Sequence, residues 1–210
     1  LKKARPQLAD WPLGKPDVIV DVPAFDVPAT GLVDYQDWSI PTKLTEGKWL
    51  RATSWKAGAT PTVHHALAGW IPEVRADGRG FSWNTSMGGY GPGGENNLSP
   101  DSTGTYLPPG GSYAFQMHYT PNGKKVKDRS SIGVKYASKP PKYELFLNEL
   151  ANMGFEIPPG AQHHKAMATF RPRADARLIA VTPHMHWRGK DYKYEVIYPD
   201  GKTETVLSVP

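Results

Sequence analysis

Histidine is the residue type whose number and spacing in this sequence could support chemistry. The chain has 210 residues and seven histidines, which are His64, His65, His118, His163, His164, His184 and His186. In an extended backbone, residues i and i+2 point to the same face. A β-strand carrying His184 and His186 would therefore present two imidazoles side by side. This spacing predicts a metal site at His184 and His186.

The adjacent pair His64-His65 needs a different local geometry. Neighbouring residues on a regular strand point to opposite faces, so both imidazoles can reach one ion only where the strand is irregular, as at a β-bulge. For the other adjacent pair, His163-His164, we expect a structural or surface role, which is the common role of histidine in a protein of this size.

The other residue types narrow the chemistry further. The sequence has no cysteine, which excludes disulfides, zinc–thiolate sites and thiol catalysis. In the absence of a dense set of carboxylates, imidazole ligands favour zinc, copper, iron or nickel over calcium and magnesium. Three histidines with an open coordination position would suit either a zinc hydroxide enzyme or a copper centre. No G-x-S-x-G, P-loop or G-x-G-x-x-G motif supports serine-triad or nucleotide chemistry.

Composition and patterning predict that strands position these histidines. Glycine and proline number 21 each and the hydrophobic fraction is 39%, which suits short strands joined by turns around a core. We expect strands at 17–22, 32–40, 48–55, 63–71, 113–120, 131–137, 163–170, 177–182, 184–186, 191–198 and 203–207. Residues 76–112 are expected to be mostly loop, with a wide glycine-rich bend at 88–94. A partial apolar stripe over 143–153 predicts one helix.

These elements suggest two domains. We expect an N-terminal arm or linker at 1–16, a β-sandwich at 17–138, a linker with the helix at 139–156, and a partial second β-sandwich at 157–210. The stretch Leu107-Pro108-Pro109-Gly110 is echoed by Ile157-Pro158-Pro159-Gly160, and both precede a histidine-bearing segment. This echo is a weak internal repeat that favours two similar domains.

Three stretches of the sequence resemble a known family. They are Val63-His64-His65, Phe115-Gln116-Met117-His118-Tyr119, and Pro183-His184-Met185-His186-Trp187-Arg188-Gly189-Lys190. In this order and approximate spacing they are similar to the signature stretches of the copper type II, ascorbate-dependent monooxygenases, which include peptidylglycine α-hydroxylating monooxygenase and dopamine β-monooxygenase. The sequence of these stretches is most similar to bacterial relatives, and the resemblance spans roughly residues 18–210.

The resemblance implies an all-β protein with two β-sandwich (jelly-roll-like) domains and two copper ions. It implies that His64, His65 and His118 bind the copper that transfers electrons. His184 and His186 would be catalytic and bind the copper at which O2 is activated and a C–H bond is hydroxylated. Gln116 would line the cleft, ascorbate or a similar reductant would supply electrons, and the protein would be secreted or periplasmic.

The sequence departs from the family pattern in ways that bear on substrate and completeness. The family's second copper takes a methionine well downstream of its H-x-H, and Met117 and Met185 are expected to be core residues. Thr182 stands where the peptide-hydroxylating member has an arginine for a substrate carboxylate, so the substrate stays open between a small molecule and a peptide-like one. We expect the chain to be a fragment or processed product whose second domain is completed by a partner protein or a missing segment.

Two further function classes fit the residues. One is a non-catalytic copper-binding or structural β-sandwich subunit of an extracellular assembly, and the other is a zinc hydrolase that uses one of the histidine sets. The formal net charge of +5 is scattered, with one short cluster at Lys124-Lys125-Val126-Lys127, so we expect no nucleic-acid partner. No apolar run approaches the roughly 20 residues of a membrane-spanning helix.

Overall fold

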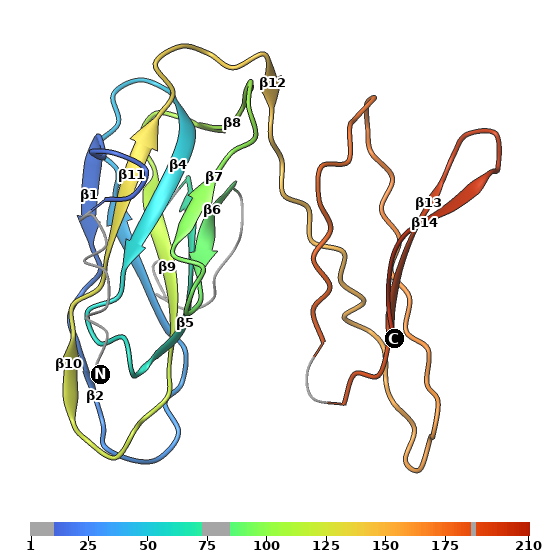
Figure 1. The fold of residues 1–210 in the computed structure, drawn as a ribbon, viewed down its shortest axis with the longest axis horizontal. Coiled ribbons are helices and arrows are strands. Elements are labelled where there is room, and N and C mark those ends of the chain that lie inside the picture. The colour runs from blue at the N-terminus through green and yellow to red at the C-terminus, as the bar shows by residue number, and fades with distance from the viewer. Residues whose placement is uncertain (1–10, 73–84, 186–187) are drawn as a thin grey trace, which may run out of the picture. The chain divides into compact units, whose positions relative to one another are not determined.

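The computed structural model describes residues 11–72, 85–185 and 188–210 (Figure 1). The chain divides into two compact units, Leu1–Asn148 (unit 1) and Glu149–Pro210 (unit 2). The described residues form strands and no helix. The strands are β1 (Val18–Asp21), β2 (Phe25–Val27), β3 (Gln36–Pro41), β4 (Lys48–Lys56), β5 (Val63–Ile71), β6 (Thr85–Tyr90), β7 (Asn96–Leu98), β8 (Thr103–Leu107), β9 (Ser112–Tyr119), β10 (Val126–Asp128), β11 (Ser131–Tyr136), β12 (Tyr143–Glu144), β13 (Tyr192–Ile197) and β14 (Thr203–Val209).

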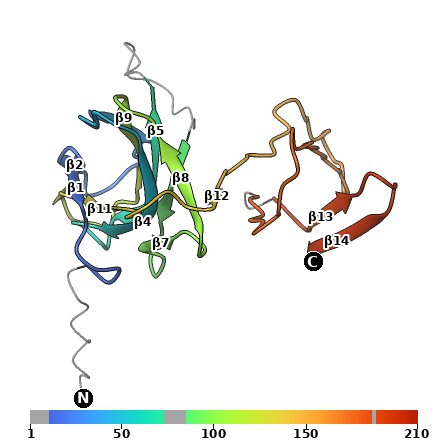
Figure 2. The same ribbon diagram turned by 90° about the horizontal axis from the view of Figure 1, so that it is seen from above.

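Unit 1 is built from two main sheets. The first has the strand order β1-β11-β4-β8-β12, with β7 also paired to β4, and the second has the order β3-β9-β5-β6. A short ladder joins β10 to β2. All pairs are antiparallel except β12 with β8. Seen from above in Figure 2, β5 and β9 lie on one side of this unit and β4, β7 and β11 lie on the other.

One hydrophobic core joins the two sheets of unit 1. Apolar residues alternate along the strands, so each sheet turns one face inward. On β9, Phe115, Met117 and Tyr119 are buried, whereas Gln116 and His118 on the opposite face are half-buried. The same cluster includes Leu50 of β4 and Ile132 of β11. The predicted all-β class is confirmed, and so is the expected placement of Met117 in the core.

The predicted helix at 143–153 is wrong. Tyr143 and Glu144 form strand β12, which pairs with Thr103 and Gly104 of β8, and the Leu145 amide donates to the Gly104 carbonyl. The backbone groups that would start a helix are used by this sheet edge instead. Strand pairing therefore overrides the local helix preference, which a partial stripe of apolar residues had indicated.

The expected long loop at 76–112 is also wrong over much of its described length. Strands β6, β7 and β8 lie within it, and β6 runs through Gly88 and Gly89 of the expected bend. Gly88 has φ of +94°, and an added Cβ there would lie 2.5 Å from the Asn97 side chain. These glycines therefore allow close strand pairing, where a local pattern suggests only a turn.

Unit 2 has much less regular structure. Its described residues form one antiparallel hairpin, β13–β14, closed by a turn in which the Tyr198 amide donates to the Lys202 carbonyl. The strands expected at 163–170 and 177–182 are absent, and Pro183–Met185 also lie outside any strand. No described side chain of unit 2 is buried. Met185, which was expected in the core, is 43% exposed.

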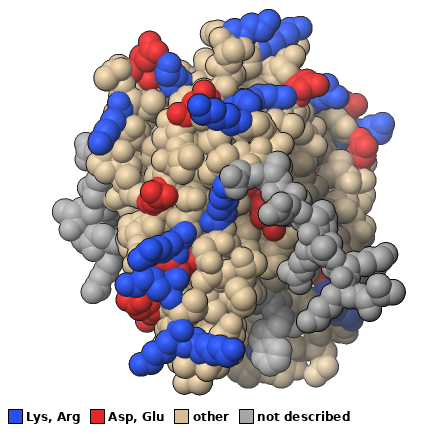
Figure 3. Space-filling model, turned by 60° about the vertical axis from the view of Figure 1, so that its left-hand side comes forward, with Lys and Arg blue, Asp and Glu red and all other residues tan. Residues whose placement is uncertain are grey.

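The described surface has mixed charge. On the face shown in Figure 3, lysines and arginines lie among aspartates and glutamates and do not form a single patch of one sign. No described segment forms a helix with the length and hydropathy needed to cross a membrane.

Candidate metal centre

Strands β5 and β9 bring three histidines together at an irregular position. Along this antiparallel pair, Val63 lies opposite Tyr119 and His65 lies opposite His118, so His64 is an extra residue on β5. An extra residue of this kind changes the direction of the side chains around it. The irregularity that the adjacent pair His64-His65 requires is therefore present.

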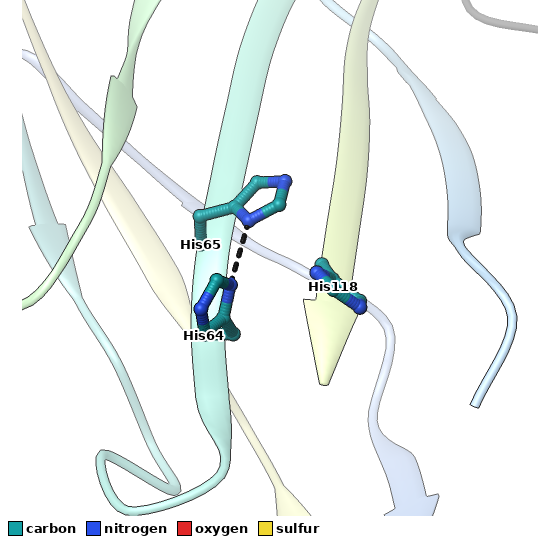
Figure 4. Close-up of side chains that lie close together, drawn as sticks. All are labelled: His64, His65 and His118. Atoms are coloured by element: carbon teal, nitrogen blue, oxygen red, sulfur yellow. Dashed lines mark hydrogen bonds between the residues drawn. The ribbon is translucent and has the colours of Figure 1, made fainter. Parts of the chain in front are cut away.

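The three imidazoles face one another (Figure 4). Their ring centroids are 4.9–5.2 Å apart, and each pair of rings is close to perpendicular. One nitrogen from each ring lies within 4.8 Å of the other two, and the Nδ1 atoms of His64 and His65 are 3.0 Å apart. Ligands around one tetrahedral ion with bonds of about 2.0–2.1 Å lie roughly 3.4 Å apart. The separation between the Nδ1 atoms of His64 and His65 is close to that spacing.

His118 carries the clearest sign of a ligand. Its Nδ1 atom is buried and has no hydrogen-bond partner among the described residues. Leaving a buried polar atom unpaired costs about 1–3 kcal/mol, and a metal ion would supply the missing interaction. Burial lowers the pKa of His118, and the neighbouring His64 lowers it further. The ring is therefore held neutral, which is the form that binds metals.

Exposure differs among the three ligands. His64 is exposed, whereas His65 and His118 are half-buried. The cluster can thus be reached from solvent on the His64 side while its other two rings rest against the sheet. The donors that the described residues gather here are imidazole nitrogens, with no carboxylate or thiolate among them. These three residues could hold one metal ion.

Tyr35 is a neighbour of this cluster that sequence reasoning missed. Its ring centroid lies 4.7 Å from that of His118 and 5.8 Å from that of His65. Tyr35 precedes β3, which pairs with β9, so its place depends on strand pairing across a long stretch of sequence. No local pattern around Tyr35 signals this contact.

Gln116 lies on the same face of β9 as His118. Its Nε2 atom donates a 3.1 Å hydrogen bond to Oδ1 of Asp37, which is directly opposite on β3. This contact fixes which end of the amide points toward β3. Gln116 is therefore an oriented polar group beside the histidine cluster, and the predicted role in lining a cleft stays a prediction.

The second predicted histidine set is not assembled by the described residues. His184 is exposed and lies in an irregular segment of unit 2, and His186 lies outside the described residues. Their predicted pairing at a second copper therefore stays a prediction. His163 and His164 are exposed, in line with the surface role expected for them.

Comparison with known proteins adds no family assignment. No protein-family model matches the chain, and a search of curated proteins finds no relative.

Proposed function

We propose that this chain is a copper-binding module of an ascorbate-dependent type of monooxygenase. In this proposal His64, His65 and His118 hold the copper that transfers electrons. His184 and His186 hold a second copper, and two β-sandwich domains carry the two sites. The observation that carries the proposal is the convergence of the imidazoles of His64, His65 and His118. The buried Nδ1 atom of His118, which has no hydrogen-bond partner among the described residues, supports it.

The donor set supports copper. Among divalent first-row metals, a given nitrogen site generally binds copper most tightly, and imidazole suits both oxidation states of copper. Copper bound in this module would supply one-electron chemistry and O2 activation, with ascorbate or a similar reductant as the external donor. The exposed ring of His64 is the edge through which a soluble reductant would reach the first site.

The protein's own residues would tune the first site in two ways. The lowered pKa of His118 keeps its ring neutral, so protons compete weakly with the metal for this ligand. The Tyr35 ring lies beside the rings of His118 and His65 and limits how far they can turn. Both features favour a preformed set of ligands.

The hydroxylating role of the second site rests on the resemblance around Pro183–Lys190. Thr182 replaces the arginine that would hold a peptide carboxylate in the family, so a substrate without a free carboxylate fits this site better. The C–H bond would be hydroxylated with O2 in a secreted or periplasmic setting.

A second candidate function is a copper-binding subunit of an extracellular assembly without turnover of its own. Unit 2 favours it, because no described side chain of that unit is buried and large apolar side chains such as Phe170 and Leu178 are about half exposed. A partner that covers these side chains would complete the unit. A zinc hydrolase is a third possibility for the three-histidine cluster.

Metal titration followed by a redox assay separates these functions. We expect two copper ions per chain, with Cu(II) spectra typical of nitrogen ligands, and oxygen uptake that requires ascorbate. One copper per chain without oxygen uptake would support the non-catalytic subunit. Stoichiometric zinc with hydrolytic activity and no response to ascorbate would overturn the copper assignment.

A further inference from the structure

A buried carboxylate bonds to residues that flank the three histidines in the sequence. Asp128, the last residue of β10, is fully buried. Its Oδ1 atom accepts hydrogen bonds from the Ala59 amide at 2.8 Å and from the Ser130 hydroxyl at 3.0 Å. Its Oδ2 atom accepts from the Tyr119 hydroxyl at 2.9 Å, and it lies 2.9 Å from the Ser130 hydroxyl, whose single proton is shared between the two carboxylate oxygens. Every contact is to a donor, so the carboxylate is well matched to its site.

Two of these donors belong to residues that lie close in the sequence to the candidate metal ligands. Tyr119 follows His118 at the end of β9. Ala59 begins a tight turn, in which its carbonyl accepts from the amides of Thr62 and Val63 at 2.8 and 3.0 Å, and His64 comes next. The Asp128 carboxylate therefore ties together the two chain segments that carry the three imidazoles.

The hydrogen bonds of Asp128 lie next to the irregular position in the pairing of β5 with β9. The extra residue at His64 lies between the pairs Val63–Tyr119 and His65–His118. A shift of one residue would turn the histidines to the opposite face of the sheet. Beyond this point the Thr120 amide donates to the Thr62 carbonyl at 2.8 Å, which keeps the strands in step.

We propose that Asp128 is a positioning residue of the three-histidine site. Through Ala59 and Tyr119 its carboxylate holds the irregular position of β5 in register with β9, and so keeps His64, His65 and His118 within reach of one ion. This inference rests on the proposed metal-binding function. It assigns the role to a residue that acts on the imidazoles through its hydrogen bonds to Ala59 and Tyr119.

The sharpest test removes one hydrogen bond and keeps the packing. Tyr119→Phe loses the hydroxyl that donates to Asp128 but retains the ring, which stacks on Phe25 at 5.0 Å. The matched control is Tyr113→Phe at the other end of β9. Tyr113 is also buried, and its hydroxyl bonds to the Tyr136 hydroxyl at 2.8 Å.

The readouts are copper affinity and the Cu(II) electron paramagnetic resonance spectrum of the full chain. We expect Tyr119→Phe to weaken copper binding roughly tenfold, at the lower end of the effect of outer-shell changes, and to alter the spectrum. Tyr113→Phe should leave both unchanged even if it lowers thermal stability equally. Ser130→Ala, which removes another donor to Asp128, should change affinity in the same direction as Tyr119→Phe.

Two negative results are distinguishable. If the wild-type chain binds no copper, the proposed function fails, and this assignment fails with it. If the wild type binds copper and Tyr119→Phe binds it with the same affinity and spectrum, only the positioning role of Asp128 is overturned. Equal effects of Tyr119→Phe and Tyr113→Phe would also overturn it, since they would show a general loss of stability.

Discussion

The two units place histidines in very different surroundings. In unit 1 the strands that carry His64, His65 and His118 have a buried face, and the core beneath them holds the rings in one place. In unit 2 His184 is exposed on an irregular segment, and no described side chain around it is buried. The difference teaches that a packed sheet is what brings His64, His65 and His118 within reach of one ion.

Removal of one ligand from each unit gives the largest expected difference. His118→Ala should weaken copper binding at the three-histidine cluster by more than the roughly 10–100-fold effect of losing an outer-shell partner. It should leave binding at His184 and His186 largely intact, because the two sets lie in different units. Copper stoichiometry measured beside His184→Ala tests this expectation. Equal losses at both sites in either variant would contradict two separate sites.

Two methionines, each next to a histidine in the sequence, allow the packing of the two units to be compared. Met117 is fully buried, whereas Met185 is 43% exposed. Met117→Ala should lower the free energy of unfolding by about 2–5 kcal/mol, because it leaves a cavity in the core. Met185→Ala should change it by less than about 0.5 kcal/mol. Urea denaturation of both variants provides the measurement, and similar losses would show that unit 2 has a core of its own.

Alkaline pH should destabilise unit 1 through one buried and one half-buried tyrosine, Tyr119 and Tyr136. Burial, together with Asp128, raises the pKa of Tyr119, and burial, together with Tyr113, raises that of Tyr136. Above about pH 10 the unfolded chain loses phenolic protons that the folded chain keeps. The free energy of unfolding should then fall with pH, by up to about 1.4 kcal/mol per pH unit for each such tyrosine.

Denaturant unfolding between pH 8 and pH 11 checks this pH dependence. The Tyr119→Phe variant removes one of the titrating groups, so its stability should fall less steeply above pH 10. A slope identical to that of the wild type would show that Tyr119 ionises alike in the folded and unfolded chains.

The aromatic neighbour of the cluster should have the smallest effect. Tyr35→Ala removes a ring packed against His118 and His65, and aromatic contacts of this kind contribute about 0.5–1.5 kcal/mol. We expect copper binding to weaken roughly two- to tenfold. Tyr35→Phe keeps the ring and should bind copper like the wild type, as measured by competition titration. A loss in the phenylalanine variant would assign the effect to the hydroxyl instead.

Much of unit 1 could be predicted from local patterns. Strand β5 has the expected bounds, and β9 differs from its expected range by one residue at each end, because alternating apolar residues and flanking turns define them. Strands β6 and β7 were missed because their glycines and asparagines resemble a loop. Such strands are stabilised by pairing with distant residues, and that pairing leaves no local periodicity.

Part of the candidate metal site could also be predicted from the sequence. The adjacent pair His64-His65 was sufficient to require an irregular strand, whereas His118 joined the predicted ligand set through the family resemblance. The position of the extra residue could not be deduced, because it depends on which residue of β9 faces Val63. Asp128 and Tyr35 likewise reach the cluster through long-range pairing. In unit 2 the alternating pattern correctly predicted strand β13. No local signal showed that apolar side chains elsewhere in the unit, such as Phe170 and Leu178, would remain exposed.

The two-residue strand β12 has a consequence for handling the protein. It pairs along the outer edge of β8, while Pro141 packs close to Gly104 of that strand. Unprotected strand edges are templates for intermolecular pairing. A shortened chain that ends before Tyr143 would leave this edge of β8 unpaired and should self-associate. A chain that ends at Asn148 would keep the pairing with β12.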